Sequence, residues 1–368
     1  MRRIFTRGLA FGDGFCNRIR EIQDLSNNIR NGTHTLLSSP RRYGKTSLAL
    51  YAIEKEKIPY AHLDLFMKYG NQEILNEFYA GIGRLWSQLV KPSEKMLKKI
   101  ESFLQNIKIS LQLGRAGLEF TLTPRHDDQK SLRFLLEGLD AYLVKNRKQV
   151  VIFVDEMQGI AESKMCDEVE SSLRFIAQKT KNIIFIFSGS NRHLLSLLFE
   201  DKSRPFYKLC HPMHIQKIAP EHYFKHLNKF AQKKWQQKLP EEVLTEITRC
   251  TDCHPYYMNV LCEKIFADQF PTVSLVQQYW QQVCYEEQGA VGRDLEFLTG
   301  KQKQLLAEIA RHPGLKEPSA KEFVNKVNLT PKGVLDALKI LIRYDLVERN
   351  SEGMISVIDP VIGFWARN

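Results

Sequence analysis

The chain has 368 residues, enough for one to three domains, and its hydrophobic content of 43% is ordinary for a globular protein with a sizeable core. No apolar run reaches the roughly 18 residues that a membrane helix needs, so we expect no membrane partner. Lys and Arg outnumber Asp and Glu by 53 to 42, and the net charge of +11 suits contact with nucleic acid without demonstrating it.

The first residues, Met1 to Phe5, are basic but lack the apolar segment of a signal peptide. The seven cysteines are odd in number and irregularly spaced, which is typical of reduced thiols. We therefore expect a cytoplasmic protein. A helical pattern begins near Phe15 and carries the charges Arg18 and Glu21, which an ordinary surface helix would also show.

The stretch from Leu36 to Leu48 has the layout of a phosphate-binding loop. An apolar run ends in a polar turn, Gly44-Lys45-Thr46 follows, and a helical pattern begins. In such a loop the backbone N–H groups wrap phosphates, and the helix N-terminus adds partial positive charge. The cofactor-binding residues expected here are Ser39, Pro40, Arg41, Arg42, Tyr43, Gly44, Lys45, Thr46 and Ser47.

Within this loop Lys45 is expected to reach the β and γ phosphates, and the Thr46 hydroxyl to ligate Mg²⁺. The motif G-x-x-x-x-G-K-[ST] asks for glycine where this chain has Ser39, and serine resists positive φ more than glycine does. The alternative is a chance strand–turn–helix with an ordinary lysine, which the strand and helix context disfavours.

Beyond the loop, Ala61 to Leu65 is expected to form a strand and residues 71–105 to be helical. Two alternating segments, Ile107 to Leu113 and Leu118 to Leu122, predict an inserted β-hairpin that serves as a flap or as a contact surface for a partner. A helix is expected over 131–145.

The run Val150 to Val154 is continuously apolar, as a strand buried on both faces of a parallel sheet should be. It ends in Asp155-Glu156, at the edge where open α/β sheets bind ligands. Asp155 is expected to hold Mg²⁺, directly or through water, and Glu156 to orient or deprotonate the attacking water. The candidate catalytic residues therefore include Lys45 beside these two acids.

A second buried strand, Asn182 to Phe187, ends in the polar segment Ser188 to Arg192. A polar residue at this point could sense the γ-phosphate, and Ser188, Ser190 and Asn191 are the candidates. A plain Gly-Ser turn is the alternative.

From Pro220 the pattern is helical over 221–236, 240–249, 256–268 and 275–285, which predicts a helical lid. Inside it, Cys250, Cys253 and His254 match the C-x-x-C-H haem attachment pattern, and Cys262 suggests zinc. Both interpretations are weak. Haem attachment needs an export route, for which we expect no signal here, and the sequence contains one such cluster only.

The C-terminal part predicts a winged helix-turn-helix. The first helix is expected over 301–311, the second begins after Ser319 as its N-cap, and the third begins at Thr330-Pro331. A hairpin over 346–357 follows these three helices. Lys332, Lys339 and Arg343 are the cations expected on its third helix, so the winged helix could bind DNA or, equally, a protein.

These motifs resemble the archaeal-type P-loop ATPases on the AAA/STAND side of the P-loop NTPases. Pro40 to Leu48 is similar to the family's "GPRRVGKTSL" loop, and Asp155 to Gln158 to its "DEFQ" segment. The resemblance implies an α/β fold with an AAA-like parallel sheet sandwiched by helices, a helical lid and a C-terminal winged helix. It also implies ATP as the nucleotide.

The same resemblance assigns further residues. Phe15 and Arg18 fit a segment that borders the adenine, and His254-Pro255 fit the start of a lid helix that approaches the nucleotide. Where the family has "PLYGR", Leu209 replaces the arginine. If that arginine is a finger that acts across a subunit boundary, Arg204 or Arg192 is the candidate to replace it.

We thus expect a P-loop core over 1–217 with a hairpin insertion near 107–122, a lid over 218–290 and a winged helix over 291–368. The expected activity is Mg²⁺-dependent hydrolysis of ATP to ADP and phosphate, which moves these parts. The alternatives are a nucleotide-gated switch that binds a protein partner or a second copy, and a DNA-binding regulator tuned by ATP.

Overall fold

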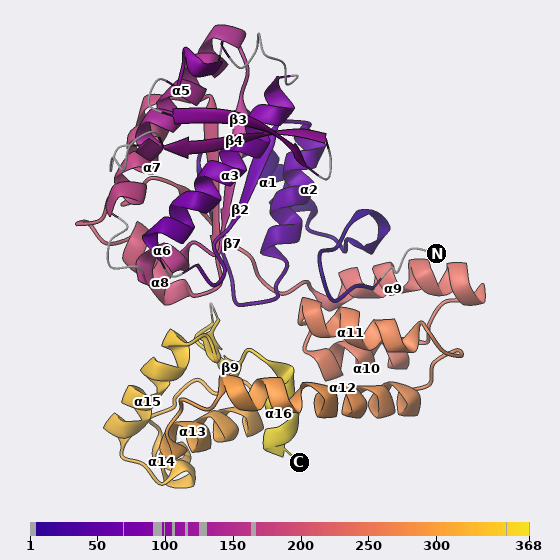
Figure 1. The fold of residues 1–368 in the computed structure, drawn as a ribbon. Helices are drawn as coiled ribbons and strands as arrows, with labels where there is room; N and C mark the ends of the chain where they lie inside the picture. Colours follow the sequence, from indigo (N-terminus) through magenta and orange to yellow (C-terminus); the bar gives the residue numbers. More distant parts are fainter. Residues whose placement is uncertain are drawn as a thin grey trace. The chain divides into compact units, whose positions relative to one another are not determined.

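The computed structural model describes residues 5–68, 70–90, 98, 100–104, 107–114, 117–124, 131–162, 167–350 and 352–367. The chain forms two compact units, one of residues 19–39 and 45–215 and the other of residues 1–18, 40–44 and 216–368 (Figure 1). No helix in the described ranges is both long and apolar enough to cross a bilayer.

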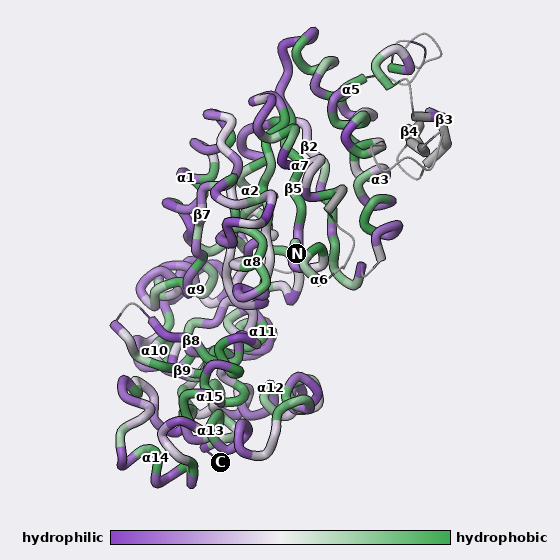
Figure 2. Tube along the Cα trace, turned by 90° about the vertical axis from the view of Figure 1, so that its left-hand side faces the viewer, coloured by the Kyte–Doolittle hydropathy of each residue, from purple (hydrophilic) through white to green (hydrophobic). Residues whose placement is uncertain are grey.

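The first unit is built on a five-stranded parallel sheet in the order β2-β5-β6-β1-β7. The strands are β1 (Thr35–Ser38), β2 (Tyr60–Asp64), β5 (Val150–Asp155), β6 (Ile183–Gly189) and β7 (His211–His214). Every residue of β5 and β6 is buried, as their continuous apolar runs predict. In Figure 2 the hydrophobic colour of β5 contrasts with the hydrophilic edge strand β7.

Helices cover both faces of this sheet. They are α1 (Ile19–Arg30), α2 (Lys45–Glu56), α3 (Asn71–Leu89), α5 (Ser131–Asn146), α6 (Gln158–Glu162), α7 (Asp167–Lys179) and α8 (Arg192–Phe199). Alternate residues of β5 and β6, such as Ile152 and Phe185, pack in one core with α3, α5 and α7. Helix α2 contacts β5 and β6 and also packs on α1. The three-layer α/β sandwich expected from the sequence is confirmed.

The expected hairpin is also present. Strand β3 (Ile107–Gly114) pairs antiparallel with β4 (Gly117–Pro124), and β4 contacts α3. The tip residues Arg115 and Ala116 lie outside the described residues. The helix expected over 71–105 ends, as α3, at Leu89, and most of residues 91–99 are likewise not described.

The second unit is helical. It contains η1 (Gly12–Gly14), α9 (Pro220–Trp235), α10 (Glu241–Thr251), α11 (Pro255–Ile265), α12 (Val273–Asp294), α13 (Gly300–Arg311), α14 (Lys321–Val327), α15 (Pro331–Arg343), β8 (Val347–Arg349), β9 (Ile355–Val357) and α16 (Pro360–Arg367). Helices α13 to α15 and the β8–β9 hairpin form the expected winged helix. One continuous apolar core joins it to α9–α12.

Two local expectations about this unit are wrong. The helix expected over 275–285 does not end there, because α12 runs through Gly289 to Asp294. The N-cap of α14 is Ala320 rather than Ser319, and no side chain caps that helix. In contrast, Thr330 caps α15 through its hydroxyl, with Pro331 at the first helical position. The boundaries 217 and 290 stay predictions, and residues 1–18 group with the helical unit.

Two helix glycines give a test of this packing. A Cβ at Gly138 of α5 would lie 2.5 Å from the backbone oxygen of Phe103, whereas a Cβ at Gly292 of α12 would meet no atom within 4 Å. We expect Gly138→Ala to destabilise the protein by about 1–3 kcal/mol through overpacking. Gly292→Ala should instead stabilise it by up to about 1 kcal/mol through helix propensity. Chemical denaturation of both variants measures the difference, and equal effects would contradict the close approach at Gly138.

Candidate functional site: a phosphate loop and a pair of acids

Three neighbouring strands bring the predicted site residues to one edge of the sheet. Strand β6 lies between β1 and β5, and the register pairs Ser38 with Gly189 and Val154 with Phe187. Parallel strands end at the same edge, so the loop after β1, the serines at the end of β6 and the acids at the end of β5 lie together.

The loop between β1 and α2 has the geometry expected of a phosphate-binding turn. Arg42 and Gly44 adopt left-handed conformations, with φ of 64° and 89°. Ser39 does not, so serine at the motif's first glycine position introduces no left-handed strain. Lys45, only 5% exposed, donates from Nζ to the backbone oxygen of Ser39 at 3.1 Å.

The loop and the β5 acid meet directly. Thr46 Oγ1 donates to Asp155 Oδ2 at 2.6 Å, across 109 positions of sequence. The other oxygen, Oδ1, accepts from the Ser188 hydroxyl and from the Glu156 backbone N–H at 3.1 Å. Burial alone would raise the pKa of Asp155, but the contacts from His62, Ser188 and Thr46 outweigh it and lower the pKa below its ordinary value. The Asp155 side chain is thus kept as a carboxylate.

These oxygens fit a magnesium ion. Mg²⁺ prefers oxygen ligands and takes one or two from protein beside phosphates and water, with neighbouring ligands about 3 Å apart. The Thr46 and Asp155 oxygens, 2.6 Å apart, fit that spacing. Across the described residues, no group of three or more His, Cys, Asp or Glu side chains could hold a metal. A magnesium ion here would complete its ligand set with nucleotide phosphates and water.

The second acid, Glu156, sits in a tight turn between β5 and α6. Its φ is 54°, a left-handed value that non-glycine residues adopt at a cost of about 1–2 kcal/mol. Its Oε2 accepts from the Ser190 hydroxyl at 2.9 Å and from the Gln158 side-chain amide. Two of the three sensor candidates, Ser188 and Ser190, therefore each hold one of the two acids.

One residue near the acids was missed by the sequence reasoning. His62 of β2 stacks on Phe153 at 4.8 Å between ring centroids, and its Nε2 lies 3.7 Å from Asp155 Oδ2. The pairing of β2 with β5 could have suggested this residue, because it places His62 beside Phe153, two positions before Asp155.

Two predicted catalytic residues, Asn191 and Arg204, interact with other parts of the protein. Asn191 caps α8, where its Oδ1 accepts from the Leu194 N–H at 3.0 Å. Arg204 forms an ion pair with the buried Glu170 of α7. Neither contacts Asp155 or Glu156 in the described chain, so a sensor role for Asn191 and a finger role for Arg204 stay predictions that this geometry does not favour.

Ser47 lies in α2 of the sheet unit, and the other predicted nucleotide-binding residues lie in the helical unit, which includes residues 40–44. Arg18 is buried and donates from Nη2 to the Tyr43 backbone oxygen at 3.3 Å. The Tyr43 ring lies edge-on to His254 at 5.0 Å, and Pro255 begins α11. Phe15 follows η1, and Arg41 is exposed.

Among the buried polar atoms that have no hydrogen-bond partner in the described residues, two belong to the lid. They are Nδ1 of His254 and the hydroxyl of Tyr223, on side chains that are 3% and 4% exposed. Both belong to the helical lid, and a buried unpaired polar atom is costly unless a ligand or water satisfies it. The Tyr223 hydroxyl had no sequence signal beyond its place on an apolar helix face.

The cysteines beside His254 do not form a metal site. Cys250, Cys253 and Cys262 are buried free thiols, and burial raises the pKa of Cys253 to about 11 and that of Cys250 to about 12. No group of three or more His, Cys, Asp or Glu side chains that could hold a metal includes them in the described chain. The zinc alternative is therefore wrong for the described residues, and the thiols belong to the core of the lid.

Comparison with solved structures agrees with this geometry. The Walker-type ATPase PABY2304 of Pyrococcus abyssi matches with a TM-score of 0.73 at 18% identity, over 99% of this chain and 100% of that one. The Aeropyrum pernix ORC2 protein, solved with ADPNP and ADP, matches with a TM-score of 0.57 at 15% identity, over 100% of this chain and 98% of that one.

The chain has the fold of the Walker-type P-loop ATPases. Residues 293–368 also match the family model of a probable winged helix domain. A search of curated proteins finds no match. The resemblance to archaeal P-loop ATPases with a C-terminal winged helix is therefore confirmed at the level of the fold.

The buried histidine of this ATPase fold predicts a pH effect. Burial, with smaller effects of Lys217 and Arg42, lowers the pKa of His254 to about 3. In the unfolded chain a histidine titrates near 6.5, so between these two values only the unfolded chain takes up the proton. Stability should therefore fall as pH falls from 6.5 towards 3, by at most about 1.4 kcal/mol per pH unit from this residue.

Thermal unfolding at pH 7.5 and pH 5.0 measures this effect. We expect a smaller drop in the unfolding temperature of His254→Phe than in the wild type, while the exposed His211→Phe serves as control. A wild-type-sized drop in His254→Phe would contradict the assignment.

Proposed function

We propose that this protein binds Mg²⁺-ATP and hydrolyses it to ADP and phosphate. The observation that carries the proposal is the hydrogen bond of 2.6 Å between Thr46 and Asp155, which joins the phosphate loop to the acid pair. The fold shared with Walker-type ATPases supports it. Adenine as the base is inferred from the sequence resemblance.

Each site residue has a task in this reaction. The Lys45 ammonium, now on the Ser39 carbonyl, would turn to the β and γ phosphates, and the loop amides would bind their oxygens. Thr46 and Asp155 would hold Mg²⁺, which neutralises charge on the phosphates. Glu156 would accept the proton of the attacking water as a general base.

The loop tip supports a coupling between nucleotide state and the lid. Arg42 lies 3.6 Å from Glu287 of α12, and its guanidinium stacks over the Tyr256 ring of α11 at 4.1 Å. Tyr256 in turn donates to Glu287 at 3.0 Å. Since residues 40–44 lead directly into Lys45, a change of loop conformation on phosphate binding would alter these contacts with α11 and α12.

The same network continues towards the winged helix. Tyr257 of α11, the neighbour of Tyr256, donates to Asp359 at 2.7 Å. Asp359 directly precedes α16, which packs on α12 and α13. A ligand that moves α11 would therefore bias the position of α16 and α13. We propose this route for the expected motion between core, lid and winged helix.

Two variants separate binding from turnover. Lys45→Ala should abolish nucleotide binding, because it removes the only loop side chain expected to reach the β and γ phosphates. Glu156→Gln should bind Mg²⁺-ATP within about twofold of the wild type and lose turnover by about 100-fold or more, since an amide is no general base. Nucleotide binding by calorimetry and phosphate release test both. Retained turnover in Glu156→Gln would reject its role.

The main rival is a nucleotide-gated switch that binds a protein. The winged helix favours a protein partner, because α15 exposes apolar Leu335 and Ile342, 41% and 37% accessible. Tyr344 and Phe297, also exposed, touch at 4.4 Å between ring centroids beside the end of α15. Nucleotide that leaves the purified protein only on denaturation, with negligible turnover, would select this switch over the enzyme.

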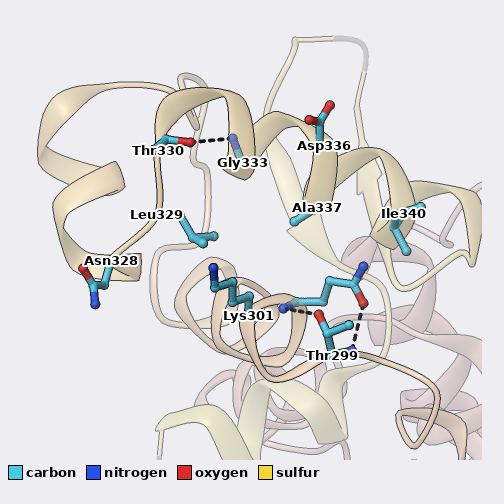
Figure 3. A pocket seen from close by; sticks show the side chains of 10 residues that line it. Thr299, Lys301, Asn328, Leu329, Thr330, Gly333, Asp336, Ala337 and Ile340 are labelled. Atoms are coloured by element: carbon cyan, nitrogen blue, oxygen red, sulfur yellow. Dashed lines mark hydrogen bonds between the residues drawn. The ribbon is translucent and has the colours of Figure 1, made fainter.

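DNA binding is the second rival. A cleft of about 570 Å³ lies between the start of α13 and α15. Figure 3 shows Lys301 on the α13 side and Asp336 on α15. On α15 the exposed cations are Lys332, Lys339 and Arg343, and Lys339 lies 3.6 Å from Asp336. Such a face suits contacts with phosphates better than recognition of bases.

If DNA binds here, the binding should be non-specific. Three phosphate contacts predict that affinity for duplex DNA falls roughly 40-fold between 50 and 200 mM salt, whatever the sequence. The double change Lys332→Glu and Lys339→Glu should weaken binding, whereas Lys55→Glu with Lys57→Glu in the sheet unit should not. Fluorescence anisotropy measures both, and no binding at 50 mM salt would remove this alternative.

A further inference from the structure

The carboxylate of Glu156 is anchored at one oxygen only. Oε2 accepts two hydrogen bonds, from the Ser190 hydroxyl at 2.9 Å and from Nε2 of Gln158. Within the described residues Oε1 accepts none. A general base needs one oxygen free for water and the rest of the carboxylate held in a fixed orientation, and this division of the two oxygens meets both needs.

The backbone around Glu156 is fixed as well. Its own N–H donates to Asp155 Oδ1 at 3.1 Å, and the next N–H, of Met157, donates to the Ser188 oxygen at 2.8 Å. The Glu156 oxygen accepts from the Gly159 N–H at 3.1 Å. These bonds hold the left-handed turn against β6, so the side-chain contacts alone decide where the carboxylate points.

Gln158 has little freedom to move from this carboxylate. A Cβ at Gly189 would lie 2.5 Å from Gln158 Oε1 and 2.9 Å from a methyl group of Leu195, so the amide fills the space that glycine leaves. The backbone of β6 at Gly189 therefore packs against the Oε1 side of the Gln158 amide, and the Nε2 side of that amide is directed at Glu156.

The hydrogen-bond pattern also fixes which way the amide faces. Nε2 donates to Glu156 Oε2 and, at 3.2 Å, to the Ser190 oxygen, and that hydroxyl donates its own proton to Glu156. The reversed amide would place its oxygen against the carboxylate and lose both bonds. In this orientation Gln158 Oε1 has no hydrogen-bond partner in the described chain. The unpaired oxygen costs free energy, which the contacts of Nε2 with Glu156 and Ser190 offset.

We propose that Gln158 is a positioning residue for the general base, which, together with Ser190, holds Oε2 so that Oε1 of Glu156 is presented to the attacking water. This role rests on the proposed hydrolysis of ATP. In the described chain, no hydrogen bond joins Gln158 to the phosphate loop or to the residues that would bind phosphate and Mg²⁺. Its loss should therefore lower turnover and leave the affinity for Mg²⁺-ATP intact.

The test compares the wild type with Gln158→Leu, Ser190→Ala, Glu156→Gln and the double variant Glu156→Gln with Gln158→Leu. Leucine keeps much of the volume of glutamine but donates no hydrogen bond. We expect Gln158→Leu to lower kcat at least tenfold with the Kd for Mg²⁺-ATP changed less than threefold. Ser190→Ala should show a smaller loss. The double variant should be no slower than Glu156→Gln, because Gln158 acts through that carboxylate.

The control is Gln178→Leu, the same change at an exposed position of α7, which should keep the wild-type kcat. Wild-type kcat in both Gln158→Leu and Ser190→Ala, or a further loss in the double variant, would overturn the positioning role while hydrolysis itself stands. Should Gln158→Leu not fold, Ser190→Ala, which removes a single oxygen, decides alone. A wild type that binds ATP without turnover would overturn hydrolysis and the positioning role together.

Discussion

The hydrogen bond between Thr46 and Asp155 is possible only because one strand separates β1 from β5 in a parallel sheet. This order brings residues near 46 and 155 to the same edge of the sheet, with the end of β6 between their strands. Every other feature of the site follows from that arrangement. The serines at the end of β6 reach the acids, Lys45 stays beside the loop carbonyl, and the three-layer packing holds the strand ends fixed.

The phosphate loop and the acid pair could be predicted from the sequence because each depends on a short segment with strong local signals. An apolar run must be a buried strand, and polar residues directly after it must lie at the sheet edge. The loop glycine and lysine specify a backbone conformation rather than a distant contact. The left-handed φ at Gly44 follows from the residue type, and the matching value at Arg42 from the course of the loop.

Side chains that have other interactions in the structure depend on competition between partners, which a linear pattern does not show. Asn191 precedes a helix, and the unpaired N–H groups of α8 compete for its side chain. Arg204 lies near a buried glutamate from another helix, which no spacing in the sequence reveals. The helix expected over 275–285 continues, as α12, through Gly289 and Gly292 to Asp294, because packing of its apolar face outweighs a propensity penalty of about 1 kcal/mol for each glycine.

The triplet Ser188-Gly189-Ser190 acquires a physical meaning from these contacts. Its first hydroxyl donates to Asp155, its second donates to Glu156, and the glycine between them leaves room for the Gln158 amide. Serine donors suit both acids, because a hydroxyl stabilises a carboxylate without adding a charge that would compete with Mg²⁺ or phosphate. A lysine or arginine at either position would hold the acid more tightly but would neutralise it. Both acids are thus held in a fixed orientation by uncharged donors, as the proposed metal binding by Asp155 and the proposed proton transfer to Glu156 require.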